Sequence, residues 1–388
     1  MLIRNHNVGL LPAVCDVSIT DACNAACDFC GFARNKRAGQ KHHWIDRSAL
    51  GRGLPLLRRR GVKYLGIQGG EPLLHPEVDH IIADAVQVGM RVALVTSGWL
   101  LPSKIDAMAD AGLRTLTVSM DSGNVATHEQ NRGLSGLAAR IQRGLERASR
   151  YPIFRIASVT VSRLVNFEEL PDTLGRLGFQ AVTFSYPRSE PFGSSSLAYG
   201  DKSQLVNFSA TELIGMLDSI ERLRTTFPVL NPSAGLQEIR RHLRGEQEIF
   251  PCVGGYKYFY IDWNLNLWRC EAWDQPLGPL QEFDRFADQR DRCTACTMSC
   301  YRDTSVFMHA GIAAGDAARH LRHGAPLKAM STLFSKSVAA SLGALFQEAR
   351  VWAPLAGIRY KDARHSENAG SCSRDERDQR GALDFSRR

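Results

Sequence analysis

The chain has 388 residues, of which 44% are hydrophobic and 23% charged, and its formal net charge is +8. This composition is that of a globular protein of roughly two or three domains, and no apolar run approaches the roughly 18 residues that a membrane-spanning helix needs. The N-terminal segment MLIRNHNVGLLPAV lacks an apolar stretch followed by a cleavage site, so we expect no signal peptide and a cytoplasmic protein. A charge of this size identifies no partner. We find no basic helix with interleaved aromatic residues in the sequence, so we do not expect nucleic-acid binding.

Short β-rich runs alternate with amphipathic helical patterns through the first half of the chain. The predicted strands are 13–20, 63–69, 91–98, 114–120, 153–162 and 181–187. The predicted helices between them are 46–60, 76–89, 102–111, 137–149 and 167–177. This alternation is typical of βαβ units and predicts an α/β fold with a parallel sheet, in which the carboxyl ends of the strands line the site.

Three cysteines directly follow the first predicted strand, in the segment ITDACNAACDFCGFA. Cys23, Cys27 and Cys30 are spaced C-x3-C-x2-C, and no fourth cysteine completes the loop. Disulfides are rare in a reducing compartment, so clustered cysteines there indicate metal or redox chemistry. Clustered thiolates select zinc or an iron–sulfur cluster, and structural zinc needs four ligands. Three ligands leave one coordination position open, which is the arrangement expected of a catalytic centre.

This spacing, with Phe29 before the last cysteine, resembles the signature loop of the radical S-adenosylmethionine (radical SAM) enzymes. The resemblance covers residues 15–187 and implies a partial (β/α)6 barrel of the radical SAM type. It implies a 4Fe-4S cluster on Cys23, Cys27 and Cys30, whose open iron binds the amino and carboxylate groups of S-adenosylmethionine. In that family an electron donor such as flavodoxin or ferredoxin reduces the cluster. The cofactor is then cleaved to methionine and a 5′-deoxyadenosyl radical, which attacks the substrate.

The segment GIQGGEPLLHP at the end of the second strand resembles the GGEP motif of the same family. There, Gly69 and Gly70 permit the backbone to approach the cofactor closely, and Glu71 would face its ammonium group. The segment TSG at the end of the third strand stands where the family usually has TNG, which leaves the role of Ser97 open.

Further candidates for cofactor binding follow from the fourth and fifth strands. TVSMDS resembles the ribose-binding element of the family, with Ser119 and Asp121 as candidates. HEQNRG resembles a segment in which Arg132 would pair with the carboxylate of the cofactor. The fifth strand offers Thr160 and Ser162. For these two and for Ser119, an ordinary polar strand end is an equally good interpretation.

A second cysteine group lies within residues 250–301. Cys252 and Cys270 flank a predicted hairpin that turns near Trp263, and three more follow, namely Cys293, Cys296 and Cys300. The group resembles the SPASM/Twitch extensions of radical SAM enzymes, although its C-x2-C-x3-C run departs from the full C-x2-C-x5-C-x3-C pattern. Five cysteines imply one auxiliary 4Fe-4S cluster with four of them as ligands, and either Cys252 or Cys270 is the candidate spare. Structural zinc on four thiolates is the alternative.

The region between the barrel and this module, 188–249, is predicted to form a connecting lid and helices. Its glycine- and serine-rich start, 188–204, predicts a lid, and a helix follows at about 210–225. Beyond the module we expect a helical extension at 302–357 and a disordered tail at 358–388.

The helical extension has a predicted apolar face with basic neighbours. Its apolar members are Phe334, Val338, Leu342, Leu345, Ala349 and Trp352. Its charged neighbours are Arg319, Arg322, Lys328, Lys336 and Arg350, against Asp316 and Glu348. A basic amphipathic helix suits peripheral contact with an anionic membrane, and a helix packed on the barrel is the simpler interpretation.

Sequence features favour a lipid or isoprenoid among small-molecule substrates. The ending C-x2-C-x3-C-Y resembles that of hopanoid-pathway adenosyltransferases, which act on a polyprenoid-derived lipid, and the basic helix points the same way. A radical SAM/SPASM peptide maturase is the alternative, although we expect no leader-peptide-binding domain ahead of the first strand. A non-catalytic iron–sulfur sensor or scaffold is the alternative from another class, and it would need neither Glu71 nor Arg132.

Overall fold

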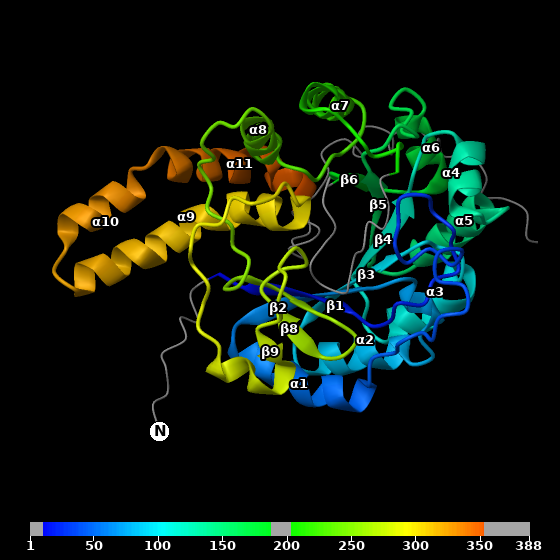
Figure 1. The fold of residues 1–388 in the computed structure, drawn as a ribbon, viewed down its shortest axis with the longest axis horizontal. Coiled ribbons are helices and arrows are strands. Elements are labelled where there is room, and N and C mark those ends of the chain that lie inside the picture. Colours follow the sequence, from blue (N-terminus) through cyan, green and yellow to red (C-terminus); the bar gives the residue numbers. More distant parts are fainter. Residues whose placement is uncertain (1–10, 188–202, 353–388) are drawn as a thin grey trace, which may run out of the picture.

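A computed structural model describes residues 11–187 and 203–352. The predicted lid at 188–204 lies mostly outside the described residues, and the predicted tail at 358–388 lies entirely outside them. The described residues contain a nine-stranded sheet with the strand order β6-β5-β4-β3-β2-β1-β7-β8-β9 (Figure 1).

The first six strands are parallel to their neighbours, as the alternation predicts. They are β1 (Ala13–Ser18), β2 (Val62–Gln68), β3 (Arg91–Thr96), β4 (Thr115–Met120), β5 (Phe154–Thr160) and β6 (Ala181–Ser185). Five predicted helices are also confirmed: α1 (Arg47–Arg59), α2 (Val78–Gln87), α3 (Leu101–Asp110), α5 (Leu137–Ala148) and α6 (Leu170–Leu177). A short 3-10 turn, η1 (Pro72–Leu74), precedes α2.

The main core lies between one face of this sheet and the helices that connect its strands. Val17 on β1 and Ile67 on β2 are fully buried there, in one cluster with Leu54 of α1. Burial of each such side chain contributes about 1.5–3 kcal/mol. Successive side chains of a strand point to opposite faces, so Asp16 and Gln68 lie on the inner face, away from this core.

Three C-terminal strands extend the sheet beyond β1. β7 (Tyr258–Ile261) pairs in parallel with β1, β8 (Asn266–Trp268) pairs antiparallel with β7, and β9 (Gly278–Pro279) with β8. The predicted hairpin turn near Trp263 is confirmed, and η2 (Leu280–Arg285) follows β9. The pairing of β7 with β1 places the second cysteine group beside the first strand of the barrel.

One helix in the described residues, at 125–132, was not predicted, whereas α7 (Ala210–Leu223) matches the expected helix at about 210–225 and a further helix lies within the predicted connecting region 188–249. α4 (Val125–Arg132) has only one buried side chain, so it lacks the apolar stripe on which the prediction relies. α8 (Ser233–Leu243) carries a buried apolar face that includes Leu236 and Ile239.

The prediction of one apolar face along the helical extension is wrong. The chain forms three helices there, α9 (Ser299–Arg322), α10 (Pro326–Leu333) and α11 (Lys336–Trp352). Gly324, with φ of +70°, and Pro326 end α9, because a left-handed glycine and a proline both stop a helix. Phe334 lies at the break between α10 and α11 and is 83% exposed, whereas Val338 is 7% exposed, so the two do not share a face. α9 and α10 extend away from the sheet (Figure 1).

Candidate functional site

The turn after β2 anchors one side of the three-cysteine loop. The N–H groups of Gly70 and Glu71 donate to the carbonyl oxygens of Thr20 and Ala22 at 2.8 and 2.7 Å. A Cβ atom on Gly69 would lie 2.3 Å from the oxygen of Thr20, and one on Gly70 would lie 2.2 Å from that of Ala22. Gly69 also has φ of +142°. Only glycine permits this approach, so both glycines of the GGEP turn are required by its contact with the cysteine loop.

The C-terminal end of α4 anchors the other side of the loop. Ala26 N–H donates to the carbonyl oxygen of Arg132 at 2.8 Å, and the guanidinium of Arg34 donates to that of Gly133 at 2.7 Å. Gly133 ends α4 in the left-handed conformation. The HEQNRG segment therefore has a structural role in the described residues, which is to hold the loop against the end of β4.

Cys23, Cys27 and Cys30 lie within electrostatic reach of one another. Burial is the largest effect at all three, and it raises the pKa of the Cys27 thiol to about 12. Glu71 raises the pKa of Cys23 further, whereas Arg132 opposes the rise at Cys27. In the described part of the chain, no three His, Cys, Asp or Glu side chains are gathered closely enough for a single metal ion. Three thiols with a carboxylate and a guanidinium beside them nevertheless fit a cluster that spreads its ligands over separate irons.

Glu71 is fully buried, and its carboxylate is held by the end of β3. One oxygen accepts from Thr96 Oγ1 at 2.6 Å and from Leu73 N–H at 3.0 Å, and the other accepts from Ser97 N–H at 2.6 Å. The contact from Ser97 uses its main-chain N–H, which any residue except proline supplies. The departure from TNG at this position therefore leaves the orientation of Glu71 intact.

Asp121 and Arg132 pair with each other. Nε and Nη2 of Arg132 donate to Oδ2 and Oδ1 of Asp121 at 2.8 and 2.6 Å, and Asn131 Nδ2 donates to Oδ2 at 2.8 Å. Burial raises the pKa of the Asp121 carboxyl, but Arg132 and His128 together hold it well below its usual range. The residues that the resemblance assigns to ribose and to carboxylate thus form one preformed ion pair beside Cys27.

The remaining candidates lie at the ends of β4 and β5. Ser119 is opposite Ser158 in the sheet register. Thr160 Oγ1 lies 3.3 Å from Ser185 Oγ on β6, whereas Ser162 is buried and accepts from a nearby main-chain N–H. The ribose-binding role of Ser119 and the cofactor-binding role of Thr160 stay predictions.

The cysteines of the second group come together around the open end of the β7–β8 hairpin, opposite its turn. Cys296 acts electrostatically on Cys252, Cys270 and Cys300, and Cys293 acts on Cys252. Burial raises the pKa of Cys252 to about 11 and that of Cys270 to about 12. Cys300, in the first turn of α9, differs because its strongest charged neighbours after burial are the carboxyls of Glu271 and Asp16. The Cys300 thiol thus lies within electrostatic reach of Asp16, whose side chain is on the inner face of the sheet.

A pair of buried carboxyls beside Cys300 was not predicted. Asp16 accepts from the hydroxyl of Tyr258 at 2.7 Å, and Gln68 Nε2 donates to Glu271. Tyr301 accepts from the main-chain N–H of Glu271 at 3.2 Å. Burial raises the pKa of both carboxyls. The signal was present in the sequence, because Asp16 is a charged residue within the first predicted strand.

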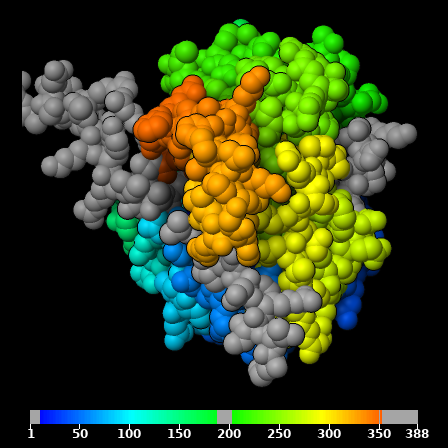
Figure 2. Space-filling view, turned by 90° about the vertical axis from the view of Figure 1, so that its left-hand side faces the viewer, coloured from blue at the N-terminus to red at the C-terminus, as the bar shows by residue number. Residues whose placement is uncertain are grey.

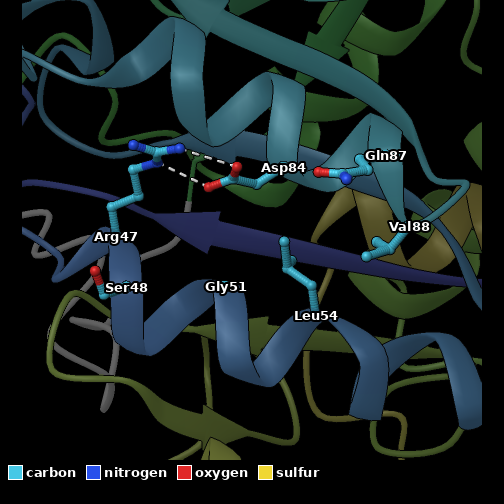
Figure 3. A pocket seen from close by; sticks show the side chains of 7 residues that line it. All are labelled: Arg47, Ser48, Gly51, Leu54, Asp84, Gln87 and Val88. Atoms are coloured by element: carbon cyan, nitrogen blue, oxygen red, sulfur yellow. Dashed lines mark hydrogen bonds and ion pairs between the residues drawn. The ribbon is translucent and has the colours of Figure 1, made fainter.

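A cavity of about 330 Å³ lies away from both cysteine groups, between α1 and α2 (Figure 3). Arg47 of α1 points across it to Asp84 of α2, with Nε and Oδ2 at 2.8 Å. No cysteine or GGEP residue lines this cavity, so we place the site at the strand ends instead.

Comparison with known families agrees with this placement. The profile of the Radical SAM superfamily matches residues 17–177, which contain the three-cysteine loop, the GGEP turn and α4. The chain carries a radical SAM domain. Members of this superfamily are enzymes that use a 4Fe-4S cluster and S-adenosylmethionine.

Curated relatives of the radical SAM domain include two kinds of enzyme. The AdoMet-dependent heme synthase of Methanosarcina barkeri is 31% identical over 213 residues, which are 51% of this chain and 57% of the synthase. The GTP 3′,8-cyclase of Stenotrophomonas maltophilia is 31% identical over 167 residues, which are 42% of this chain and 50% of the cyclase. The chain thus spans about half the length of the curated relatives it matches.

Solved structures resemble more of the chain than the radical SAM domain alone. Streptococcus suis SuiB bound to S-adenosylmethionine has a TM-score of 0.55 at 14% identity, covering 74% of this chain and 68% of SuiB. AnSMEcpe with bound AdoMet has a TM-score of 0.52 at 14% identity, covering 89% of this chain and 100% of anSMEcpe. At such identities the likeness shows the fold alone, and it confirms the predicted partial barrel.

Proposed function

We propose that this chain cleaves S-adenosylmethionine reductively at a cluster held by Cys23, Cys27 and Cys30, and that its substrate is a lipid or isoprenoid. The observation that carries the proposal is the arrangement at the strand ends. Three thiols lie there with the buried carboxylate of Glu71 and the guanidinium of Arg132 beside them. When bound, the cluster and the cofactor supply a 5′-deoxyadenosyl radical.

The residues of the chain position the cofactor in this proposal. Glu71, oriented by the end of β3, accepts from the ammonium group of the methionine moiety. Arg132, oriented by Asp121, donates to its carboxylate. Ser119 faces the ribose, and Thr160 is a further contact to the cofactor. Both charged groups are held by other side chains or main-chain groups before the cofactor arrives, so little side-chain entropy is lost on binding.

The second cysteine group holds an auxiliary 4Fe-4S cluster in this proposal, as in SPASM/Twitch modules. We assign its ligands to Cys252, Cys270, Cys293 and Cys296, because Cys252 lies within electrostatic reach of Cys296 and Cys293, and Cys270 lies within reach of Cys296 and Cys252. Cys300 is then the spare thiol, in place of Cys252 or Cys270, because it is set against Glu271 and Asp16. Zinc is the competing metal, and iron and zinc analysis of the purified protein distinguishes the two.

The test of the reaction is anaerobic turnover. Protein reconstituted with iron and sulfide, given S-adenosylmethionine and either dithionite or a flavodoxin or ferredoxin system, is expected to form 5′-deoxyadenosine, measured by liquid chromatography and mass spectrometry. The Glu71→Ala variant is expected to keep its iron and lose this product. Wild-type protein with an intact cluster and no 5′-deoxyadenosine would contradict the proposal.

Support for the substrate class comes from several sides. The curated relatives are named for small-molecule chemistry, a heme synthase and GTP 3′,8-cyclases, and the basic helices at the C-terminus favour a lipid within that class.

The competing function is peptide maturation, because SuiB was solved with its precursor peptide SuiA. Adding lipid extract or candidate peptides to the turnover assay decides between them, since only the true substrate acquires a mass change. We expect the protein in the cytoplasm, at the membrane surface.

A further inference from the structure

The exposed apolar side chains of this protein are concentrated in one place. Among the described residues, nine large hydrophobic side chains are exposed, and all but Trp44 lie between residues 321 and 346. These eight are Leu321, Leu327, Met330, Leu333, Phe334, Leu342, Leu345 and Phe346. They belong to the end of α9, to α10 and to α11, which we call the helical arm (residues 317–347). The arm extends to one side of the sheet in Figure 1, and its tip faces the viewer in Figure 2.

The fold covers only one side of the arm. α10 and α11 both pack against α9, and the small or β-branched side chains of Ala329, Val338 and Ala344 are buried on that side. The opposite side presents the largest apolar groups, with Leu327 81% and Phe346 84% exposed. Monomeric proteins rarely expose so many large apolar side chains together, and such a patch marks an interaction surface.

The charge of the arm has one sign. From residue 317 to residue 347 the sequence has no aspartate or glutamate, and it has four cations: Arg319, Arg322, Lys328 and Lys336. Arg319 pairs with Asp316 at the base of the arm, whereas the other three are exposed. Large apolar side chains interspersed with exposed cations are the composition of helices that lie in the interface of an anionic bilayer.

We infer that the helical arm docks this protein on an anionic lipid surface. Leu327, Phe334 and Phe346 enter the acyl boundary, and Lys328 and Lys336 contact the lipid phosphates. A second copy of the chain fits this surface poorly, because a symmetric contact would bring two like-charged arms together. The inference goes beyond the proposed reaction, and lipid binding is measured without turnover, so the two fail separately.

The geometry of the arm also bears on whether it could cross a bilayer. Among the described helices, none alone is long and apolar enough to cross a bilayer. Pro326–Leu333 and Lys336–Ala349 meet the length and composition test only as a pair, with a bend of 45° between them.

The experiment is co-sedimentation of the full chain, purified anaerobically, with two kinds of vesicle. One is phosphatidylcholine alone, and the other contains phosphatidylglycerol in addition. Partitioning to the anionic vesicles is expected to exceed that to the neutral ones by about tenfold or more. The variant L327S/F334S/F346S and the variant K328E/K336E are each expected to reduce it by about tenfold or more. Trp44→Ser and Lys63→Glu, exposed residues outside the arm, are the matched controls and are expected to bind as the wild type does.

Circular dichroism and iron content establish that each variant is folded. Wild-type binding that is absent, or that is equal for the two kinds of vesicle, overturns the inference. Loss of binding in the two control variants also overturns it. A dimer in light scattering that the triple serine variant abolishes would show that the arm is an interface between copies instead. Retention on vesicles after an alkaline carbonate wash would show insertion, which contradicts surface docking.

Discussion

The two cysteine groups of this chain are built in different ways. Cys23, Cys27 and Cys30 belong to one loop whose main chain is bonded to the β2 turn on one side and to the end of α4 on the other. The second group is assembled from separate segments, which packing of side chains brings together. The rings of Tyr258 and Tyr301 lie 4.3 Å apart between these segments, and Arg302 pairs with the buried carboxylate of Glu248.

This difference has a physical consequence. A short loop held by main-chain hydrogen bonds tolerates side-chain replacement, because the bonds depend on few side chains. A site held by buried aromatic rings and buried ion pairs responds strongly to single substitutions. Substitutions in the two regions therefore test whether each group is a separate centre, as we propose.

The largest expected effect is on turnover. The variant C23A/C27A/C30A is expected to abolish formation of 5′-deoxyadenosine while the iron of the second group remains. The reason is that the second group lies on other segments of the chain. Iron analysis and product analysis of the same sample measure both quantities, with Cys372→Ser as the control. Loss of all iron in the triple variant would show that the two groups depend on each other.

The next effect concerns the metal content of the second group. Cys270→Ser is expected to lose about four iron atoms, the content of one 4Fe-4S cluster, whereas Cys300→Ser is expected to lose none. Each is a replacement of a half-buried thiol by a hydroxyl, so the pair is matched in chemistry. Equal iron loss in both variants would assign Cys300 to the ligand set.

A smaller effect is expected on the unfolding free energy when the Asp121–Arg132 ion pair beside the first cysteine group is broken. Arg132→Ala leaves the buried carboxylate of Asp121 without its ion-pair partner and is expected to cost about 3–5 kcal/mol of unfolding free energy. Arg59→Ala, which breaks an exposed pair with Asp284, is the control and is expected to cost about 0–1 kcal/mol. Denaturant titration measures both, and equal losses would contradict the assigned role of the Asp121–Arg132 pair.

The smallest expected effect is a pH dependence of the unfolding free energy that arises from Asp16. Burial raises the pKa of Asp16 above its ordinary value of 3.8, so the folded protein holds this proton more tightly than the unfolded chain. The stability that this proton contributes is present below pH 3.8 and is lost as the pH rises through the raised pKa. The unfolding free energy of Asp16→Asn, taken relative to that of the wild type, is therefore expected to be about 1–3 kcal/mol greater at pH 8 than at pH 4. Thermal unfolding at both pH values checks this, and an effect independent of pH would contradict it.

Local patterns carried the prediction of the barrel and of the first cysteine group. The alternation of strands and helices is a short-range signal, and the C-x3-C-x2-C spacing and the GGEP turn are each contained in a few neighbouring residues. Eleven predicted strands and helices before residue 188 therefore correspond to β1–β6, α1, α2, α3, α5 and α6 in the structure.

By itself, the sequence determined which chemical groups the strand ends carry, because strand period and motif spacing act over short distances. Only the tertiary structure decided that Asp121 pairs with Arg132, that β7 joins β1, and that Asp16 meets Tyr258. It also decided that α4, which has only one buried side chain, is helical and contacts the cysteine loop through its C-terminal end. The same holds for the helical arm, whose apolar residues divide between a buried side and an exposed side according to their contact with α9. Such contacts join separate segments of the chain, and no local period encodes them.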